Sequence, residues 1–250
     1  MSSGLPLNLP KNKVLYVVAT PIGNLEDISL RAIKTLKEVD FILAEDTRKT
    51  VTLLKHFGIE KPVESFFDHN EHFKAPQIAQ RLKSGESAAL VSDAGTPTIS
   101  DPGFRLVREC KKENVAVIPI PGASSMLTAL AASSAPREKF VFLGFLPKKE
   151  GERKKLLERL LTWDLTAVFL ESPQRINKSL ASIRDVLGDR KLTVARELTK
   201  KFEEILETNT QNAIEYFIGH GARGEFTIIV HRADESKKGK NNNEGGEKYA

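Results

Sequence analysis

Four short segments that contain proline with glycine or hydroxyl residues follow apolar runs of the sequence, and each of them could hold a ligand. They are TPIGN (20–24), SDAGTP (92–97), PGASS (121–125) and ESPQR (171–175). Glycine lets the backbone pass close to a ligand, and the amides at the start of a following helix favour negative charge. Each segment alone could equally be an ordinary turn. Four of them at the ends of predicted strands favour one shared binding site.

Motifs for other chemistries are missing or stand in the wrong context. The chain has no GxxxxGK[ST] phosphate loop and no GxSxG nucleophile elbow, and its one cysteine, Cys110, should be an inert packing thiol. GHGARG (219–224) matches GxGxxG, but it follows a predicted helix and precedes a predicted strand, the reverse of a dinucleotide-binding turn. We therefore expect it to end a helix and to bring a glycine towards the ligand site.

The segment DHNEH (68–72) places four possible metal ligands in a predicted loop. They are Asp68, His69, Glu71 and His72. No cysteine completes a set, so the sequence favours a substrate contact or a solvated loop, and we expect no metal.

Composition limits the class of protein. The 250 residues suffice for one large domain or two small ones, and 40% hydrophobic with 28% charged residues is ordinary for a globular chain. No apolar run approaches the ~20 residues of a membrane span and no signal peptide is evident, so we expect a cytoplasmic protein. A net charge of +5 can attract polyanions but does not establish nucleic-acid binding.

Apolar runs alternate with helix-period segments along most of the chain, which predicts two α/β lobes joined near residues 120–122. The first lobe should hold a mainly parallel sheet covered on both faces, and the second a more mixed sheet. The predicted parts are an N-terminal extension (1–13), an N-terminal α/β domain (14–120), a C-terminal α/β domain (121–232) and a disordered polar tail (233–250).

The same periodicities place the individual elements. Strands are predicted at 14–19, 40–45, 88–91, 115–120, 139–145, 166–171, 191–197, 202–208 and 225–231. Helices are predicted at 27–39, 48–57, 76–83, 104–112, 124–132, 152–161, 174–187 and 211–218. Asp27 should cap the first helix, and Gly58 should end the second.

Several long segments resemble one known family. They are VVATPIGNLEDISLRAIKTLKEVDFILAEDTRKT, ALVSDAGTPTISDPGFRLVREC, PIPGASS with the following FVFLGFLPKK, and VARELTKKFEE. Together they are similar to the ribosomal RNA small-subunit methyltransferase I family, the 2'-O-ribose methyltransferases of the tetrapyrrole-methylase superfamily. The likeness runs from Val14 to His231. Tetrapyrrole enzymes differ at the equivalent loops, with GPG in the first and GGDP in the third.

The resemblance implies two α/β domains of the tetrapyrrole-methylase type with S-adenosylmethionine in an interdomain cleft. It implies methyl transfer to a cytidine 2'-hydroxyl in the decoding region of 16S rRNA, presented as RNA or as an assembled 30S subunit, by a homodimer with no membrane partner. Relatives commonly carry a further basic helical segment at the C-terminus, whereas this chain has a polar tail, so RNA contacts from that segment are not carried over.

The resemblance also implies which residues contact the cofactor, through small side chains, backbone amides and hydroxyls. They are Ile22, Asp93, Ala94, Gly95, Thr96, Ile99, Ser124, Ser125, Glu171, Ser172, Glu197, Leu198, Gly224 and Thr227. For each residue singly, turn or cap chemistry is the alternative.

Attack by a ribose hydroxyl requires loss of its proton, and acids at the predicted strand ends could accept it. Glu45 and Asp46 are the first candidates, with Arg48 orienting them or holding a phosphate, and Asp101 is the second. The alternative for EDTR is a helix N-cap with a local ion pair, and the alternative for Asp101 is capping of the next helix. Basic residues predicted to contact RNA are Arg105, Lys148, Lys149, Arg153, Lys154, Lys155, Lys200 and Lys201, with a solvated helix start as the alternative for the lysine-rich patch.

Two other functions remain open from the sequence. One is methylation of a tetrapyrrole or diphthine by another branch of the superfamily, which TPIGN, EDTR and the basic patches argue against. The other is RNA binding without catalysis. Labelled methyl incorporation separates these alternatives from rRNA methylation.

Overall fold

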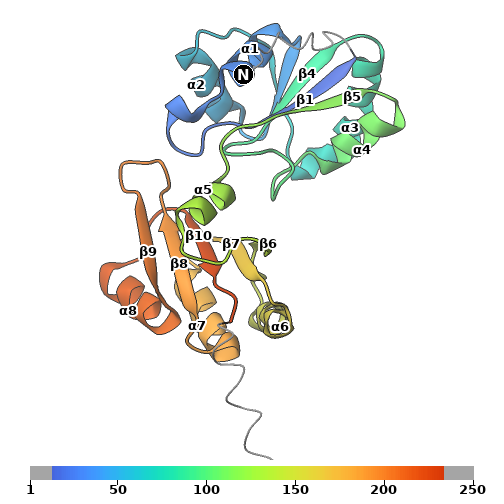
Figure 1. Ribbon diagram of the computed structural model, residues 1–250. Helices are drawn as coiled ribbons and strands as arrows, with labels where there is room; N and C mark the ends of the chain where they lie inside the picture. The colour runs from blue at the N-terminus through green and yellow to red at the C-terminus, as the bar shows by residue number, and fades with distance from the viewer. Residues whose placement is uncertain (1–12, 234–250) are drawn as a thin grey trace, which may run out of the picture. The chain divides into compact units, whose positions relative to one another are not determined.

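The computed structural model describes residues 13–233, which form two compact α/β units divided between Ser125 and Met126 (Figure 1). We call them unit 1 and unit 2. The predicted N-terminal extension and polar tail lie outside the described residues, except for Lys13 and Ala233. Within residues 13–233, no helix is long and apolar enough to cross a membrane.

Unit 1 is built on a five-stranded sheet in which all neighbouring strands run parallel, in the order β3-β2-β4-β1-β5. This confirms the predicted parallel sheet. The strands are β1 (Val14–Val18), β2 (Phe41–Ala44), β3 (Val63–Ser65), β4 (Ser87–Val91) and β5 (Ala116–Ile120). The helices are η1 (Leu25–Asp27), α1 (Leu30–Glu38), α2 (Thr47–His56), α3 (Asp68–Lys83) and α4 (Phe104–Lys112).

Helices cover both faces of this sheet because successive strand residues alternate between two cores. On β1, Val14, Tyr16 and Val18 pack against α1 and α2, whereas Leu15 packs against α3 and α4. Figure 1 shows α1 and α2 apart from α3 and α4 across the sheet. Cys110 lies in the second core, where burial raises its pKa to about 12, so its thiol stays protonated as expected of a packing residue.

Two local predictions for unit 1 were wrong, and one strand was missed. Asp27 does not cap α1, because the chain first makes the η1 turn and Ser29 then accepts a hydrogen bond from the Ala32 amide at 3.1 Å. DHNEH is not a loop but the start of α3, which begins at Asp68 and continues through Pro76. The short strand β3 was missed, since three half-buried residues carry no periodic signal.

Unit 2 has the predicted mixed sheet, in the order β6-β7-β10-β8-β9, in which only β6 and β7 pair in parallel. The strands are β6 (Phe140–Phe145), β7 (Thr166–Glu171), β8 (Lys191–Arg196), β9 (Glu204–Asn209) and β10 (Phe226–Val230). The helices are α5 (Ser125–Ala132), α6 (Glu150–Thr162), α7 (Ile176–Leu187) and α8 (Thr210–His220), and α6, α7 and α8 bury their apolar sides in one core with the sheet. Helix α8 ends at Gly221, with φ 73°, as predicted for GHGARG.

Strand direction determines where ligands can meet unit 1. Because all five strands are parallel, their carboxyl ends share one edge of the sheet. The segments after β1, β2, β4 and β5 therefore emerge side by side, and these include TPIGN, EDTR, SDAGTP and PGASS.

Candidate functional site

The three segments that contain glycine, TPIGN, SDAGTP and PGASS, are in direct contact at the carboxyl edge of unit 1. Thr20 and Gly95 exchange backbone hydrogen bonds of 2.9 and 3.1 Å, and the Thr20 hydroxyl donates to the Ser92 carbonyl at 3.1 Å. Gly122 packs against Ala19, so that a Cβ added there would lie 2.9 Å from the alanine side chain. The loops after β1, β4 and β5 thus form one contiguous surface, which we call the unit 1 edge.

The segment after β4 holds an unfavourable backbone conformation. Thr98 and Ser100 have φ values of 74° and 66°, and they flank Ile99, whose exposed fraction is 50%. A β-branched residue with positive φ is strained, and such strain collects at ligand-binding sites. This conformation presents an apolar side chain to solvent in the segment that follows Gly95.

Four carboxylates gather at the same edge: Glu45 after β2, Asp68 after β3, and Asp93 and Asp101 after β4. Partial burial raises the pKa of Glu45 above its usual value, and the charges of Asp93 and Asp68 add to the effect. Burial raises the pKa of Asp101 to about 6, with contributions from the other three acids, although a hydrogen bond from Ser92 opposes the rise. Asp101 is therefore a base that can take up a proton near neutral pH.

Asp46 and Arg48 have a different environment from these acids. Asp46 caps α2 by accepting from the Arg48 amide at 3.0 Å, and its two oxygens accept from the Arg48 Nε at 3.0 Å and a terminal guanidinium nitrogen at 2.7 Å. Hydrogen bonding by Arg48 lowers the pKa of Asp46 to about 2. Asp46 and Arg48 thus form a helix cap with a local ion pair, which is the alternative that the sequence left open. A carboxylate held in this way is a weak proton acceptor.

Asp93 links the gathered acids to the start of α2. Its carboxylate accepts from the Asp46 amide at 3.1 Å and from the Lys49 ammonium at 2.7 Å. These contacts fix the start of SDAGTP against the start of α2. Nearby, Ser124 and Ser125 are half-buried, and α5 begins at Ser125.

Unit 2 gathers its own predicted residues where β7 and β8 end and β10 begins. Phe226 of β10 pairs with Glu171 on one side and with Arg196 on the other, which brings Glu171, Glu197 and Gly224 to one end of the sheet. Glu197 and Thr199 have φ values of 50° and 66° and flank the buried Leu198, repeating the strained pattern around Ile99. Thr227 is buried within β10, one residue after Phe226.

Two acids of unit 2 are committed to internal contacts. The buried Glu171 carboxylate accepts from the Ser172 amide at 2.9 Å, from the Ser179 hydroxyl and from Arg175. Glu197 accepts from the Glu225 amide and the Lys200 ammonium, both at 2.9 Å, and hydrogen bonding by Lys200 lowers its pKa. Gly224 lies against Glu197 so closely that a Cβ there would be 2.3 Å from its Cγ.

The predicted RNA-binding residues divide by exposure. Arg153 is only 5% exposed and donates to the Ser182 hydroxyl and to the carbonyls of Pro147 and Lys148, so its prediction as a phosphate contact was wrong. Lys154 is shared between Glu150 and Asp185, and Lys200 between Glu197 and Glu225. The exposed remainder is Arg105, Lys148, Lys149, Lys155 and Lys201, of which Lys149 forms an ion pair with Glu152.

Glu71 has a structural role that the sequence did not reveal. Its buried carboxylate accepts from the Gly103 amide at 3.1 Å and the Arg105 amide at 2.8 Å, so α3 supplies the N-terminal cap that α4 lacks in its own sequence. These two amide contacts account for the burial of the Glu71 carboxylate.

We expect Glu71→Ala to lower the free energy of unfolding by about 1–3 kcal/mol, because two buried amides lose their acceptor. Glu71→Gln keeps an acceptor oxygen and should lose less. Urea denaturation of both variants measures the difference, and equal losses would contradict the capping role.

Comparison with known proteins identifies the family. Residues 14–214 match the tetrapyrrole (corrin/porphyrin) methylase family. Among proteins named ribosomal RNA small subunit methyltransferase I, the chain is 47% identical over 216 residues to that of Halalkalibacterium halodurans, covering 86% of this chain and 75% of the relative. It is 45% identical over 216 residues to that of Thermotoga maritima, covering 86% and 97%.

Solved structures show the same fold at low identity. A cobalt precorrin-4 methyltransferase aligns with a TM-score of 0.65 and 16% identity, covering 91% of this chain and 98% of that one. A diphthine synthase aligns with a TM-score of 0.65 and 15% identity, covering 87% and 90%. The chain therefore belongs to the tetrapyrrole methylase family and, within it, to the ribosomal RNA small subunit methyltransferase I group.

Proposed function

We propose that this protein transfers a methyl group from S-adenosylmethionine to the 2'-hydroxyl of a cytidine in the decoding region of small-subunit rRNA. The observation that carries the proposal is the 45–47% identity, across most of both chains, to proteins named for small-subunit rRNA methylation. The proposal includes a cytoplasmic homodimer that acts on rRNA, either free or within the 30S subunit. Light scattering of the purified protein tests for the dimer, whose mass should be twice the 27.8 kDa of one chain.

Residues of unit 1 fit such a cofactor. Gly95 uses its own amide and carbonyl on Thr20, so direct contacts should come from its exposed neighbours Ala94 and Thr96. Ile99 offers apolar surface, and Asp93 a carboxylate for an ammonium or a hydroxyl. Bound S-adenosylmethionine supplies a methyl group on a positively charged sulfur. From unit 2 the proposal retains Ser172, Leu198, Gly224 and Thr227, together with backbone groups of Glu171 and Glu197.

We assign the proton-accepting role to Asp101 in the first place and to Glu45 in the second. Both lie at the unit 1 edge and both have a raised pKa, whereas Arg48 depresses that of Asp46. A raised pKa makes a carboxylate a better acceptor for the proton of a weakly acidic hydroxyl. The remaining task of the protein is alignment of the hydroxyl, which the fixed loops of the unit 1 edge support.

Transfer of labelled methyl groups tests the reaction and its alternatives. Purified protein with tritiated S-adenosylmethionine should label small subunits taken from a strain that lacks its own enzyme of this group. The label should be recovered as 2'-O-methylcytidine. Labelling of a precorrin or of a diphthine precursor, with none in RNA, would select the other branch of the superfamily, and RNA binding without labelling would select a non-catalytic role.

A further inference from the structure

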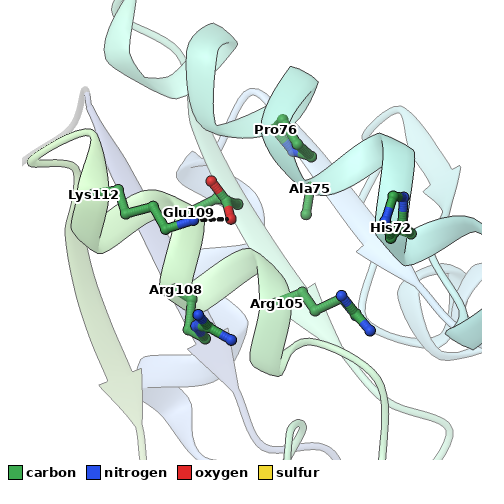
Figure 2. Close-up of a pocket in the computed structure, with 7 residues that line it drawn as sticks. All are labelled: His72, Ala75, Pro76, Arg105, Arg108, Glu109 and Lys112. Atoms are coloured by element: carbon green, nitrogen blue, oxygen red, sulfur yellow. Dashed lines mark hydrogen bonds and ion pairs between the residues drawn. The ribbon is translucent and has the colours of Figure 1, made fainter.

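A basic groove runs between α3 and α4 in unit 1, with a volume of about 280 Å³. We call it the α3–α4 groove. Figure 2 shows its walls, with His72, Ala75 and Pro76 from α3 facing four charged side chains from α4. Those four are Arg105, Arg108, Glu109 and Lys112.

The groove carries an excess of positive charge. Glu109 pairs with Lys112 at 2.7 Å, which neutralises one of the three cations. Arg105 and Arg108 are exposed, and no carboxylate among residues 13–233 forms an ion pair with either of them. Two unpaired guanidinium groups in one groove attract an anion that can accept several hydrogen bonds, and phosphate suits that geometry.

The spacing of the cations fits an extended anion rather than a single one. Arg105, Arg108 and Lys112 stand three and four residues apart on one side of α4 and span about 10 Å along its axis. The Arg108 guanidinium lies 5.7 Å from the ring centroid of Phe104, which is 62% exposed. A row of cations beside an exposed aromatic ring is the combination that binds single-stranded RNA, through its phosphates and through base stacking.

The groove begins at the proposed reaction site. Helix α3 starts at Asp68, one of the four gathered acids, and α4 starts three residues after Asp101. Glu71 holds the two helix starts together through the Gly103 and Arg105 amides. Arg105 is the second residue of α4, so its side chain leaves the helix within the first turn, four residues along the chain from Asp101.

We propose that the α3–α4 groove binds the phosphate backbone of the RNA strand next to the target nucleotide. Arg105 and Arg108 bind successive phosphates, and Phe104 stacks on a neighbouring base. The proposal rests on the proposed function, because it takes RNA to be the substrate. It gives Asp101 a defined neighbour, the strand that carries the reacting ribose.

Neutralising the groove tests this assignment through RNA binding. The test compares Arg105→Ala/Arg108→Ala with Lys37→Ala/Lys55→Ala, which removes the same charge from α1 and α2 on the opposite face of the sheet. The probe is a fluorescein-labelled, unmethylated single-stranded RNA with the decoding-region sequence, and anisotropy is read at several salt concentrations. Thermal melting and S-adenosylmethionine binding are measured in parallel and should not change.

Loss of two phosphate contacts should weaken binding by about 25-fold at 0.1 M salt and make the slope of log K against log salt shallower by about 1.4. For the control pair, the change in log K and the change in slope should each be at most about a third of the changes in the groove variant. Arg108→Lys should retain the slope, since it keeps the charge. Equal slopes for the groove variant and the control pair would contradict RNA binding in the α3–α4 groove. Failure of the wild-type protein to bind the RNA would contradict it too.

Methyl transfer by the wild type is measured separately. Its absence would overturn the proposed reaction, whereas the binding comparison alone decides the groove. A groove variant that binds RNA as the wild type does would exclude the groove even if methyl transfer were established.

Discussion

Asp101→Asn should reduce the rate of methyl transfer by about 10²–10⁴-fold while leaving S-adenosylmethionine affinity within about twofold, because a general base acts in the transition state. Asparagine preserves the shape of the side chain but cannot accept a proton. The measurement is single-turnover transfer to unmethylated small subunits. Glu60→Gln removes an exposed carboxylate elsewhere in unit 1 and serves as the matched control, with no change expected.

The pH dependence of the wild type follows from the same residue. Because burial raises the pKa of Asp101 to about 6, the base is protonated below that pH and the rate should fall tenfold per pH unit there, with a plateau above. Persistence of this pH dependence in Asp101→Asn, with a loss of rate below tenfold, would assign the role elsewhere. Glu45→Gln would then be the variant to show the large loss.

The raised pKa of Asp101 also predicts how the stability of the fold changes with pH. A carboxyl whose pKa is higher in the folded state stabilises the fold when it is protonated, so its contribution is complete below about pH 4 and is lost as pH rises through about 6. At pH 7.5 the Asp101 carboxylate therefore destabilises the fold. Asp101→Asn should melt at a higher temperature than wild type at pH 7.5, and the difference should vanish at pH 4.

Gly103→Ala should lower the free energy of unfolding by about 3 kcal/mol. Gly103 precedes α4 with φ 129°, a conformation that L residues rarely adopt, and an added Cβ would lie 2.5 Å from Leu90 Cδ2 and 2.9 Å from Thr98 Cγ2. Leu90 is buried in β4, so both backbone strain and overpacking contribute. Urea denaturation gives the value.

Gly58→Ala is the control for backbone strain alone. Gly58 also has a positive φ, of 60°, but nothing lies within 4 Å of a Cβ placed there. Its expected cost is about 1 kcal/mol. Similar losses for the two variants would show that the close approach to Leu90 does not matter.

The sequence predicted most elements of the fold because its periodicities are strong. Strand β1 is a continuous apolar run, and α1 has apolar residues at helical spacing, so the local sequence was enough to locate both. The errors arose where tertiary contacts decide. Nothing local distinguishes Ser29 from Asp27 as a helix cap, and Glu71 becomes a cap for α4 only when α3 and α4 pack together.

Charge was the least predictable property of the site from sequence. Arg153 resembles its exposed neighbours in PKKEGERKK, but α6 turns it towards Ser182 of α7. Burial raises the pKa of Asp101, and acids that follow three different strands add to the rise, neither of which a linear pattern reveals. The sequence indicated part of the α3–α4 groove, because the spacing of Arg105, Arg108 and Lys112 places three cations on one helix face. Of these three residues, only Arg105 was predicted to bind RNA.

The central claim is that the unit 1 edge supports methylation of a ribose in small-subunit rRNA. Its most direct test maps 2'-O-methylcytidine in the decoding region, in cells that carry the gene, cells that lack it, and cells that carry only Asp101→Asn. The account predicts one modified cytidine in the first strain and none in the other two. An identical 2'-O-methylation map in all three strains would contradict it.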